Sequence, residues 1–370
     1  MSALNTKKTR GQFYTVNHSY ILEGLPYPSS IENTVGHRDE ITPDISRIME
    51  PFAGTGELLE WIRHNYANHH ITIPPIEAYD IDPKKEGILT RDTLMSPPDY
   101  TDAWILTNPP YLARNKCATK EIFDKYNTND LYKCFITSIT QQPAPCAGGI
   151  LIIPAGFFLS PRDIDVRCRH EFMTKYKLLK VKYFEETVFP DTHTTVVAFA
   201  FEKASDPLVE QQVEWISMPS GNTRVFTMSA DHNWIIGGDI YDFPVSDNIK
   251  IRRHVDGSPL KEGEQQTYMT LCALDSGKTG GNLCLEYKEG YIYPAKDCSR
   301  TYATLRIQGR VLSAQEQRQI CDNFNALIEK KREETWSLFL PQYRESKEYA
   351  RKRIPFELAY TIVCHLVMQL

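Results

Sequence analysis

The chain has 370 residues, which is long enough for one large domain or for two. Hydrophobic residues make up 41% and charged residues 24%, which excludes wholesale disorder. The 42 Lys and Arg residues against 47 Asp and Glu residues give a net charge of −5, so nucleic-acid binding would require basic residues gathered on one face.

Cysteine and apolar patterns narrow the class of protein further. The nine cysteines include no Cys-x-x-Cys pair, which indicates reduced thiols rather than a zinc knuckle or a disulfide framework, and no metal site is expected. The longest apolar stretches, residues 148–159 and 359–368, are shorter than the roughly 20 residues of a membrane helix. The first thirty residues lack the apolar core of a signal peptide. We therefore expect a soluble protein that is not secreted.

Short apolar runs alternate with amphipathic stretches in the first two hundred residues, which predicts an α/β sheet. Seven strands are expected, at residues 45–49, 76–79, 88–90, 104–107, 149–154, 178–184 and 195–201. Helices are expected over residues 57–66 and 131–140. Seven strands in this order suit a doubly wound sheet, whose ligands bind at the carboxyl ends of its strands.

The pattern changes after about residue 202, where turn-rich segments and short polar runs with many glycines begin. This predicts two domains, residues 1–203 and 204–370. A helical pattern runs from Ser313 to Phe339, with Ser313 and Glu316 forming a capping box and Pro341 ending it. One or two helices are expected over residues 345–353 and 356–370.

Two glycines follow the first expected strand, in the segment Glu-Pro-Phe-Ala-Gly-Thr-Gly-Glu at residues 50–57. Gly54 and Gly56 would let the backbone approach a bound ligand where a Cβ atom would collide. Leu59 stands where a third glycine would complete a dinucleotide-binding motif. A plain turn between strand and helix therefore stays an alternative.

An acidic residue, Asp80, ends the second expected strand. A carboxylate at this position can accept hydrogen bonds from both hydroxyls of a ribose. Asp82 competes for this role, and either residue could serve only as a turn residue before Pro83.

The segment Asn108-Pro-Pro-Tyr111 directly follows the fourth expected strand. Two consecutive prolines make a rigid, non-helical exit from a sheet. The side-chain oxygen of Asn108 and the carbonyl of Pro109 can then accept the two hydrogens of one amine, while Tyr111 offers an aromatic face to a planar base. The alternative is a purely structural Pro-Pro loop.

Four segments together resemble the N6-adenine DNA methyltransferases of restriction-modification systems, in the motif order of the gamma group. These segments are residues 10–15 (Arg-Gly-Gln-Phe-Tyr-Thr), 50–56, 79–83 and 108–111, with further likeness at 130–135, 148–154 and 189–196. The resemblance covers about residues 7–203 and says much less about the remainder. It implies a seven-stranded S-adenosylmethionine-dependent methyltransferase sheet, followed by a smaller mixed α+β target-recognition domain.

The resemblance also implies roles for particular residues. Glu50 would lie near the amino group of the cofactor, Ile81 on its adenine ring, and Asp92 at its adenine amine. Tyr111 and Phe189 would sandwich the target adenine. The residues implied to hold S-adenosyl-L-methionine are Gln12, Phe13, Tyr14, Thr15, Glu50, Gly54, Gly56, Asp80, Ile81, Asp92 and Asn108, and the implied catalytic residues are Asn108, Pro109, Pro110 and Tyr111.

The activity implied is methyl transfer to N6 of an adenine that is flipped out of a short palindromic site in double-stranded DNA. Such an enzyme is expected to be a cytoplasmic monomer in a bacterial or virus-infected cell, paired in function with a restriction endonuclease. The opening segment is most similar to relatives that modify CATG. Two alternatives stay open: the same site could methylate an RNA base or a protein glutamine, or the chain could be a DNA-binding specificity module without catalysis.

The region from Arg300 to Arg353 carries 12 Lys and Arg against 7 Asp and Glu residues. These basic side chains are candidate phosphate contacts, although solvated helix faces have the same composition. Arg306, Gln308 and Arg310 are candidate base readers, because Arg commonly reads guanine and Gln reads adenine.

Overall fold

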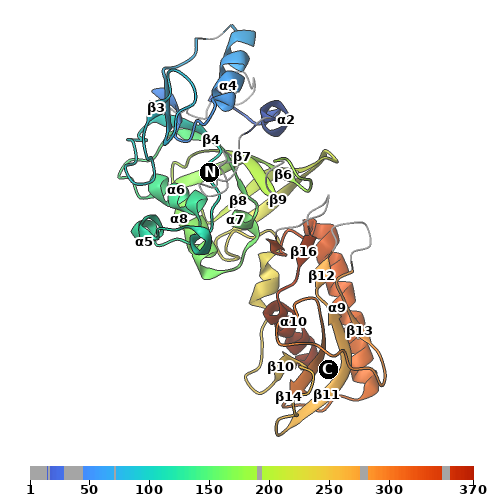
Figure 1. The fold of residues 1–370 in the computed structure, drawn as a ribbon. Helices are drawn as coiled ribbons and strands as arrows, with labels where there is room; N and C mark the ends of the chain where they lie inside the picture. Colours follow the sequence, from blue (N-terminus) through green and yellow to red (C-terminus); the bar gives the residue numbers. More distant parts are fainter. Residues whose placement is uncertain are drawn as a thin grey trace. The chain divides into compact units, whose positions relative to one another are not determined.

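The computed structural model describes residues 15, 17–28, 45–70, 72–189, 194–275, 282–343 and 351–370. It divides into two compact units, the first comprising Met1–Phe158 and Arg162–Trp234 and the second comprising Leu159–Pro161 and Ile235–Leu370. The predicted domain boundary after residue 203 is therefore too early, because two further strands join the sheet of the first unit (Figure 1).

A nine-stranded mixed sheet forms the first unit, in the order β3-β2-β1-β4-β5-β7-β6-β8-β9. Each of the seven expected strands is present, but the expected count of seven is wrong because β8 pairs in parallel with β6 and β9 pairs with β8. The strands are β1 (Arg47–Glu50), β2 (Ile76–Asp80), β3 (Leu89–Thr90), β4 (Ala103–Thr107), β5 (Gly148–Pro154), β6 (Tyr176–Phe184), β7 (Val196–Lys203), β8 (Glu210–Met218) and β9 (Asn222–Ser229).

Helices accompany this sheet, and two of them match the sequence prediction closely. They are α2 (His18–Leu22), α4 (Glu57–Asn68), α5 (Glu121–Tyr126), α6 (Leu131–Thr140), α7 (Gly156–Leu159) and α8 (Asp163–Lys175), with the 3-10 turn η1 (Arg114–Lys116). Every residue of α6 is buried, and so is every residue of β4. Burial of a strand on both of its faces is typical of the centre of a parallel sheet covered on both sides.

The sheet changes winding direction beside β1, which pairs in parallel with β2 on one side and with β4 on the other. The carboxyl ends of these three strands therefore meet at one edge of the sheet. In open α/β sheets, ligands bind in the crevice at such a switch point. The segments that carry the predicted site residues follow these three strands directly.

The second unit contains a four-stranded antiparallel sheet, β10-β14-β11-β13, and a three-stranded sheet, β12-β16-β15. Its long helix α9 packs against β13, β11 and α10 around a core that includes Leu271, Leu305, Phe324 and Ile362 (Figure 1). The elements are η2 (Gly238–Asp242), β10 (Lys250–Arg253), β11 (Glu264–Cys272), β12 (Leu274–Asp275), β13 (Cys284–Tyr287), β14 (Tyr302–Gln308), α9 (Ala314–Thr335), β15 (Gln342–Tyr343), β16 (Arg351–Arg353) and α10 (Phe356–Met368).

The start of α9 confirms the predicted capping box: the Ser313 backbone N–H donates to the Glu316 carboxylate, and the Glu316 N–H donates to the Ser313 hydroxyl. The helix ends at Thr335, earlier than predicted, because Trp336 adopts the left-handed conformation with φ +53°. The expected helix over residues 345–353 is not found where the chain is described, since Arg351–Arg353 form a strand. Of the helices described, none has the length and apolar character needed to cross a bilayer.

Candidate active site

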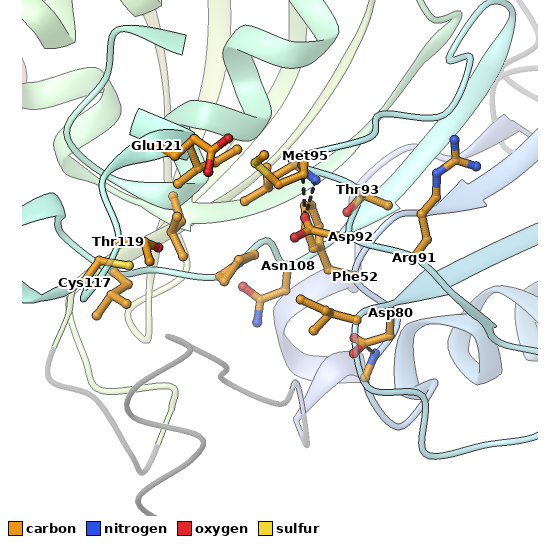
Figure 2. A pocket seen from close by; sticks show the side chains of 17 residues that line it. Phe52, Asp80, Arg91, Asp92, Thr93, Met95, Asn108, Cys117, Thr119 and Glu121 are labelled. Atoms are coloured by element: carbon orange, nitrogen blue, oxygen red, sulfur yellow. Dashed lines mark hydrogen bonds between the residues drawn. The ribbon is translucent and has the colours of Figure 1, made fainter. Parts of the chain in front are cut away.

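A cavity of about 400 Å³ lies at the switch point of the first sheet (Figure 2). Side chains from the loops after β1, β2, β3 and β4 line it, together with residues of α5 and α6. The lining residues are Phe52, Gly54, Asp80, Ile81, Arg91, Asp92, Thr93, Leu94, Met95, Asn108, Pro110, Leu112, Cys117, Thr119, Glu121, Ile122 and Leu131.

Asp80 connects the ends of β1 and β2. Its Oδ2 atom accepts a hydrogen bond from the Gly54 N–H at 2.8 Å, and its Oδ1 atom accepts one from the Asp82 N–H at 2.8 Å. The side chain is buried and lines the cavity. The carboxylate of Asp82 instead forms an ion pair with Lys84 at 2.7 Å, with side chains of 43% and 45% exposure. This arrangement favours Asp80 over Asp82 as the acceptor for a ligand in the cavity.

Both predicted glycines of the loop after β1 adopt positive φ, +52° at Gly54 and +83° at Gly56. Only glycine adopts this region without a steric penalty. A Cβ atom at Gly56 would also come within 3.3 Å of the Lys85 side chain. The loop leads directly into α4, so its backbone is held close to the cavity by strand and helix together.

Glu50 carries a buried carboxylate at the end of β1. Its exposed fraction is 1%, and its Oε2 atom has no hydrogen-bond partner among the residues that the structure describes. Burial, and then the negative charges of Glu57 and Asp80, raise the pKa of Glu50 well above its ordinary value. A buried acceptor without a donor indicates a missing partner, and the ammonium group of an amino-acid ligand supplies the complementary charge.

Asp92 and Ile81 line the same cavity with different chemistry. The Asp92 carboxylate accepts hydrogen bonds from the backbone N–H groups of Leu94 and Met95 at 3.2 and 3.0 Å, which fixes its loop. The Ile81 side chain is 51% exposed, an apolar surface that a flat ring could cover. Figure 2 shows the side chains of Asp80, Asp92 and Asn108 around one hollow. The chemistry of Asp80, Ile81 and Asp92 fits the ribose and adenine of S-adenosylmethionine.

Asn108 is buried at the end of β4 and lines the cavity. Its Nδ2 atom donates to the Thr15 hydroxyl at 3.1 Å, so the structure brings these two predicted site residues together, and their contact with a cofactor stays a prediction. Its Oδ1 atom accepts from the hydroxyl of Tyr111. Pro109 is buried and Pro110 lines the cavity, so the rigid Pro-Pro segment that follows β4 forms part of the cavity wall.

Tyr111 and Phe189 are not among the lining residues of this cavity. The Tyr111 ring is 7% exposed, and its hydroxyl also donates to the Ile152 carbonyl at 2.6 Å. Burial and the charge of Asp130 raise the pKa of Tyr111 well above its ordinary value, so the hydroxyl stays protonated. Phe189 is 1% exposed. Their stacking on a base stays a prediction, as do the roles of Gln12, Phe13 and Tyr14, which lie outside the described residues.

Eleven of the 17 residues that line the cavity were not among the site residues predicted from the sequence. Phe52 lies inside a segment that was singled out, and Thr93 adjoins Asp92, so proximity to a motif could have found both. Cys117 and Glu121 belong to the segment after Asn108-Pro-Pro-Tyr111, which has no motif of its own. No sequence signal marks these two positions.

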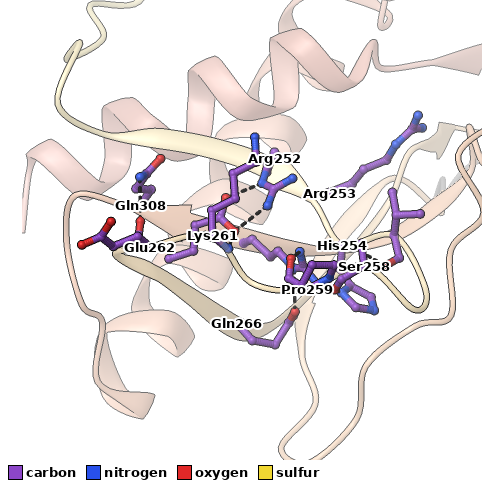
Figure 3. Close-up of polar contacts among 12 residues, drawn as sticks. Arg252, Arg253, His254, Ser258, Pro259, Lys261, Glu262, Gln266 and Gln308 are labelled. Carbon is purple, nitrogen blue, oxygen red and sulfur yellow. Dashed lines mark hydrogen bonds and ion pairs between the residues drawn. The ribbon is translucent and has the colours of Figure 1, made fainter.

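The candidate base readers of the second unit are occupied by contacts within the protein. Arg306 is 2% exposed and donates to the carbonyls of Pro259 and Ser258, to the Gln266 side chain and to His254. Figure 3 labels these four partners. A guanidinium so fully buried cannot reach a base edge, so the prediction for Arg306 is wrong.

The other two candidates are held as well. The Gln308 amide donates to the Glu262 carbonyl at 2.9 Å (Figure 3). The Arg310 guanidinium donates to the Val367 carbonyl at 2.7 Å and pairs with Glu316 at 2.8 Å.

The described residues contain no group of three or more His, Cys, Asp or Glu side chains that could hold a metal ion.

Comparisons with known proteins yield similarity at the level of structure alone. No family model matches the sequence, and no curated protein matches it. Among solved structures, a type I restriction-modification methyltransferase subunit from Streptococcus thermophilus is 13% identical, with 55% of this chain and 47% of that chain covered and a TM-score of 0.35.

Two further solved structures give similar values. A structure of the type I R-M system is 15% identical over 58% of this chain and 47% of that chain, with a TM-score of 0.41. The DrdV–DNA complex is 15% identical over 62% of this chain and 31% of that chain, with a TM-score of 0.41. The chain thus spans less than half the length of each of these three proteins.

Proposed function

We propose that this chain is an S-adenosylmethionine-dependent DNA methyltransferase that modifies N6 of adenine. The observation that carries the proposal is that Asn108 lines the same cavity as Asp80 and Asp92. A ribose acceptor, an adenine contact and an amine acceptor then border one space, as methyl transfer between a nucleoside cofactor and a planar amine requires.

The cavity fits the cofactor by the chemistry of its donors and acceptors. We assign the ribose of S-adenosylmethionine to Asp80 and its adenine ring to Ile81 and Asp92, which line the cavity. We assign the ammonium group to Glu50, the last residue of β1, which is not among the lining residues. When bound, the cofactor supplies an electrophilic methyl group on a positively charged sulfur. The unpartnered Oε2 atom of Glu50 supports this assignment, because a buried carboxylate is stabilised by a cation.

Asn108 and Pro109 would act on the target amine through hydrogen-bond acceptance. The lone pair of an adenine amine is delocalised into the ring, which makes the amine a poor nucleophile. Two acceptor oxygens favour a more tetrahedral nitrogen and direct its lone pair away from the ring. This is positioning with electrostatic stabilisation, and it needs no covalent intermediate.

Double-stranded DNA is the proposed substrate, with the target adenine flipped out of the helix. Extrusion costs a few kcal/mol, and stacking on an aromatic side chain returns about 1–3 kcal/mol per base. Tyr111 and Phe189 are the proposed stacking residues. We further propose that the protein acts as a monomer and protects a short palindrome against a partner restriction endonuclease.

Radiolabelled S-adenosylmethionine incubated with the purified protein and with DNA, RNA or total protein in parallel tests the proposal. Label is expected in DNA, and mass spectrometry of the nucleosides is expected to identify N6-methyladenine. If the label appears in RNA or in protein glutamine instead, the proposed methyl transfer in the cavity stands, but DNA is not the substrate. Cofactor binding without transfer to any acceptor would identify a specificity module without catalysis.

A further inference from the structure

We infer that the second unit contains a phosphate-binding pocket at the N-terminus of α10. The pocket has a volume of about 360 Å³. It is lined by Arg253 at the end of β10, Arg300 before β14, and Arg353 at the end of β16, together with Pro341, Ile354, Pro355, Phe356 and Glu357. Three arginines from three separate segments thus line one pocket that holds one carboxylate.

Four other described arginines of this unit have carboxylate partners, whereas Arg306 is held by backbone carbonyls, Gln266 and His254. Arg252 pairs with Glu264, Arg310 with Glu316, Arg318 with Glu289, and Arg332 with Asp275 and Glu329. Arg253 and Arg300 have no carboxylate within ion-pair distance in the described part of the chain. Two uncompensated guanidinium groups in one pocket leave positive charge for an external anion.

Internal contacts hold Arg253 in place. Its guanidinium donates to the carbonyls of Asp297 and Ser299, and it lies 5.5 Å from the centre of the Phe356 ring. A guanidinium has five N–H donors, so three remain for a ligand. The two carbonyls belong to the loop that leads into Arg300, so Arg253 also positions the arginine beside it.

The N-terminus of α10 adds backbone donors to the pocket. This helix runs for 13 residues from Phe356, and its N-cap residue Pro355 has no side chain that could cap it. The first helical N–H with a partner in this turn is that of Ala359, which donates to the Pro355 carbonyl at 3.1 Å. The preceding N–H groups point out of the helix, where its dipole favours an anion.

The ligand that matches the uncompensated guanidinium groups of Arg253 and Arg300 beside a helix N-terminus is a phosphate group, whose oxygens accept several charged hydrogen bonds at once. Its source in the proposed function is the phosphodiester backbone of DNA, and that part of the inference rests on the proposed function. The capacity to bind phosphate depends only on the second unit. Arg306, which was expected to contact DNA, contributes instead to the fold.

Arg300→Gln and Arg353→Gln, alone and combined, test the pocket in the full-length protein. Arg318→Gln is the matched control, because Arg318 is a partly exposed arginine of the same unit that pairs with Glu289 outside the pocket. Thermal unfolding identifies any variant that fails to fold. Binding of a fluorescent DNA duplex is measured as a function of salt, and binding of inorganic phosphate is measured by calorimetry.

We expect each pocket variant to weaken DNA binding roughly tenfold and to lower the slope of log K against log[salt] by about 1, with no change in Arg318→Gln. If the variants lose phosphate binding but their DNA binding keeps the wild-type dependence on salt, the phosphate site is confirmed and its ligand is a free phosphate, not DNA. Wild-type protein that binds phosphate but no DNA would refute the DNA substrate and not the pocket. Variants that match the control in both measurements would overturn the inference.

Discussion

The hydroxyl of Tyr111 donates to the side-chain oxygen of Asn108, the atom that we assign as an acceptor for the target amine. The same hydroxyl donates to the Ile152 carbonyl at 2.6 Å, so one proton is shared between two acceptors. An amide oxygen has two lone pairs, so a target amine at Asn108 would share this oxygen with Tyr111 and need not displace it. The structure shows Asn108 already satisfied by its own loop and by Thr15 before any base arrives.

Tyr111→Phe removes the hydroxyl and keeps the aromatic ring, so it measures the contributions of the two groups separately. Without the hydroxyl, the buried Ile152 carbonyl loses its donor, so we expect stability to fall by about 1–3 kcal/mol. The aromatic face is retained, and methyl transfer should stay within about threefold of wild type, whereas Tyr111→Ala should lose roughly 10–100-fold. Single-turnover kinetics and denaturant unfolding measure both quantities. Equal losses in the two variants would make the hydroxyl, and not the ring, the functional group.

Asp80→Asn and Asp82→Asn form a matched pair two residues apart. Asp80 lines the cavity and Asp82 does not, so Asp80→Asn should weaken S-adenosylmethionine binding roughly 10–100-fold through loss of charged hydrogen bonds. Asp82→Asn should leave the dissociation constant nearly unchanged. Calorimetry with the cofactor product distinguishes them, and the reverse ranking would transfer the ribose contact to Asp82.

Glu50→Gln should have opposite effects on stability and on binding. Because burial raises the pKa of Glu50, the folded protein without cofactor binds a proton that the unfolded chain releases, and stability falls as the pH rises above the ordinary value of 4.5. The glutamine removes this penalty, so the variant without cofactor should unfold at a higher temperature than wild type at pH 8.

The same carboxylate should make cofactor affinity pH-dependent. An ammonium group favours ionised Glu50, so wild-type affinity should strengthen as the pH rises towards the raised pKa and should weaken as the pH falls. Glu50→Gln should bind roughly 10–100-fold more weakly and without this dependence. A parallel pH dependence in both proteins would remove Glu50 from the cofactor site.

Phe189→Leu tests base stacking at a buried position. Phe189 is 1% exposed, so truncation to alanine would cost about 3–5 kcal/mol and confuse folding with function. Leucine keeps most of the apolar volume and removes the aromatic face. With 2-aminopurine at the target position, we expect the fluorescence increase on binding to be smaller in the variant, and an unaltered increase would make Phe189 a core residue only.

Periodicity and motif spacing predicted the first unit well because local features dictate its strands. Central strands such as β4 and β5 are continuous apolar runs, and α6 is apolar throughout, so their positions follow from composition. The pairing of β8 with β6 could not be predicted, because it joins strands through non-local hydrogen bonds. The turns at residues 204–207 and 219–222 therefore resemble a linker in sequence and connect strands of one sheet in the structure.

The second unit marks the limit of sequence reasoning more clearly. Arg306 and Arg300 look alike in sequence, but one is enclosed by carbonyls and the other lines an open pocket. Whether an arginine supports the fold or faces a ligand depends on which distant carbonyls and carboxylates reach it. In the first unit, the positions of Asp80 and Asn108 in the cavity were predictable because Asp80 ends β2 and Asn108 directly follows β4 at the switch point.

The most direct test of the central claim is single-molecule sequencing of DNA from cells that express this protein, beside cells that express Asn108→Ala. We predict N6-methyladenine at one short motif with the wild-type chain and its loss with the variant, whose cofactor affinity should stay within a few-fold of wild type because Asp80 and Glu50 are intact. Unmodified DNA in both cultures, with cofactor binding demonstrated in vitro, would contradict the assignment of DNA adenine as the substrate.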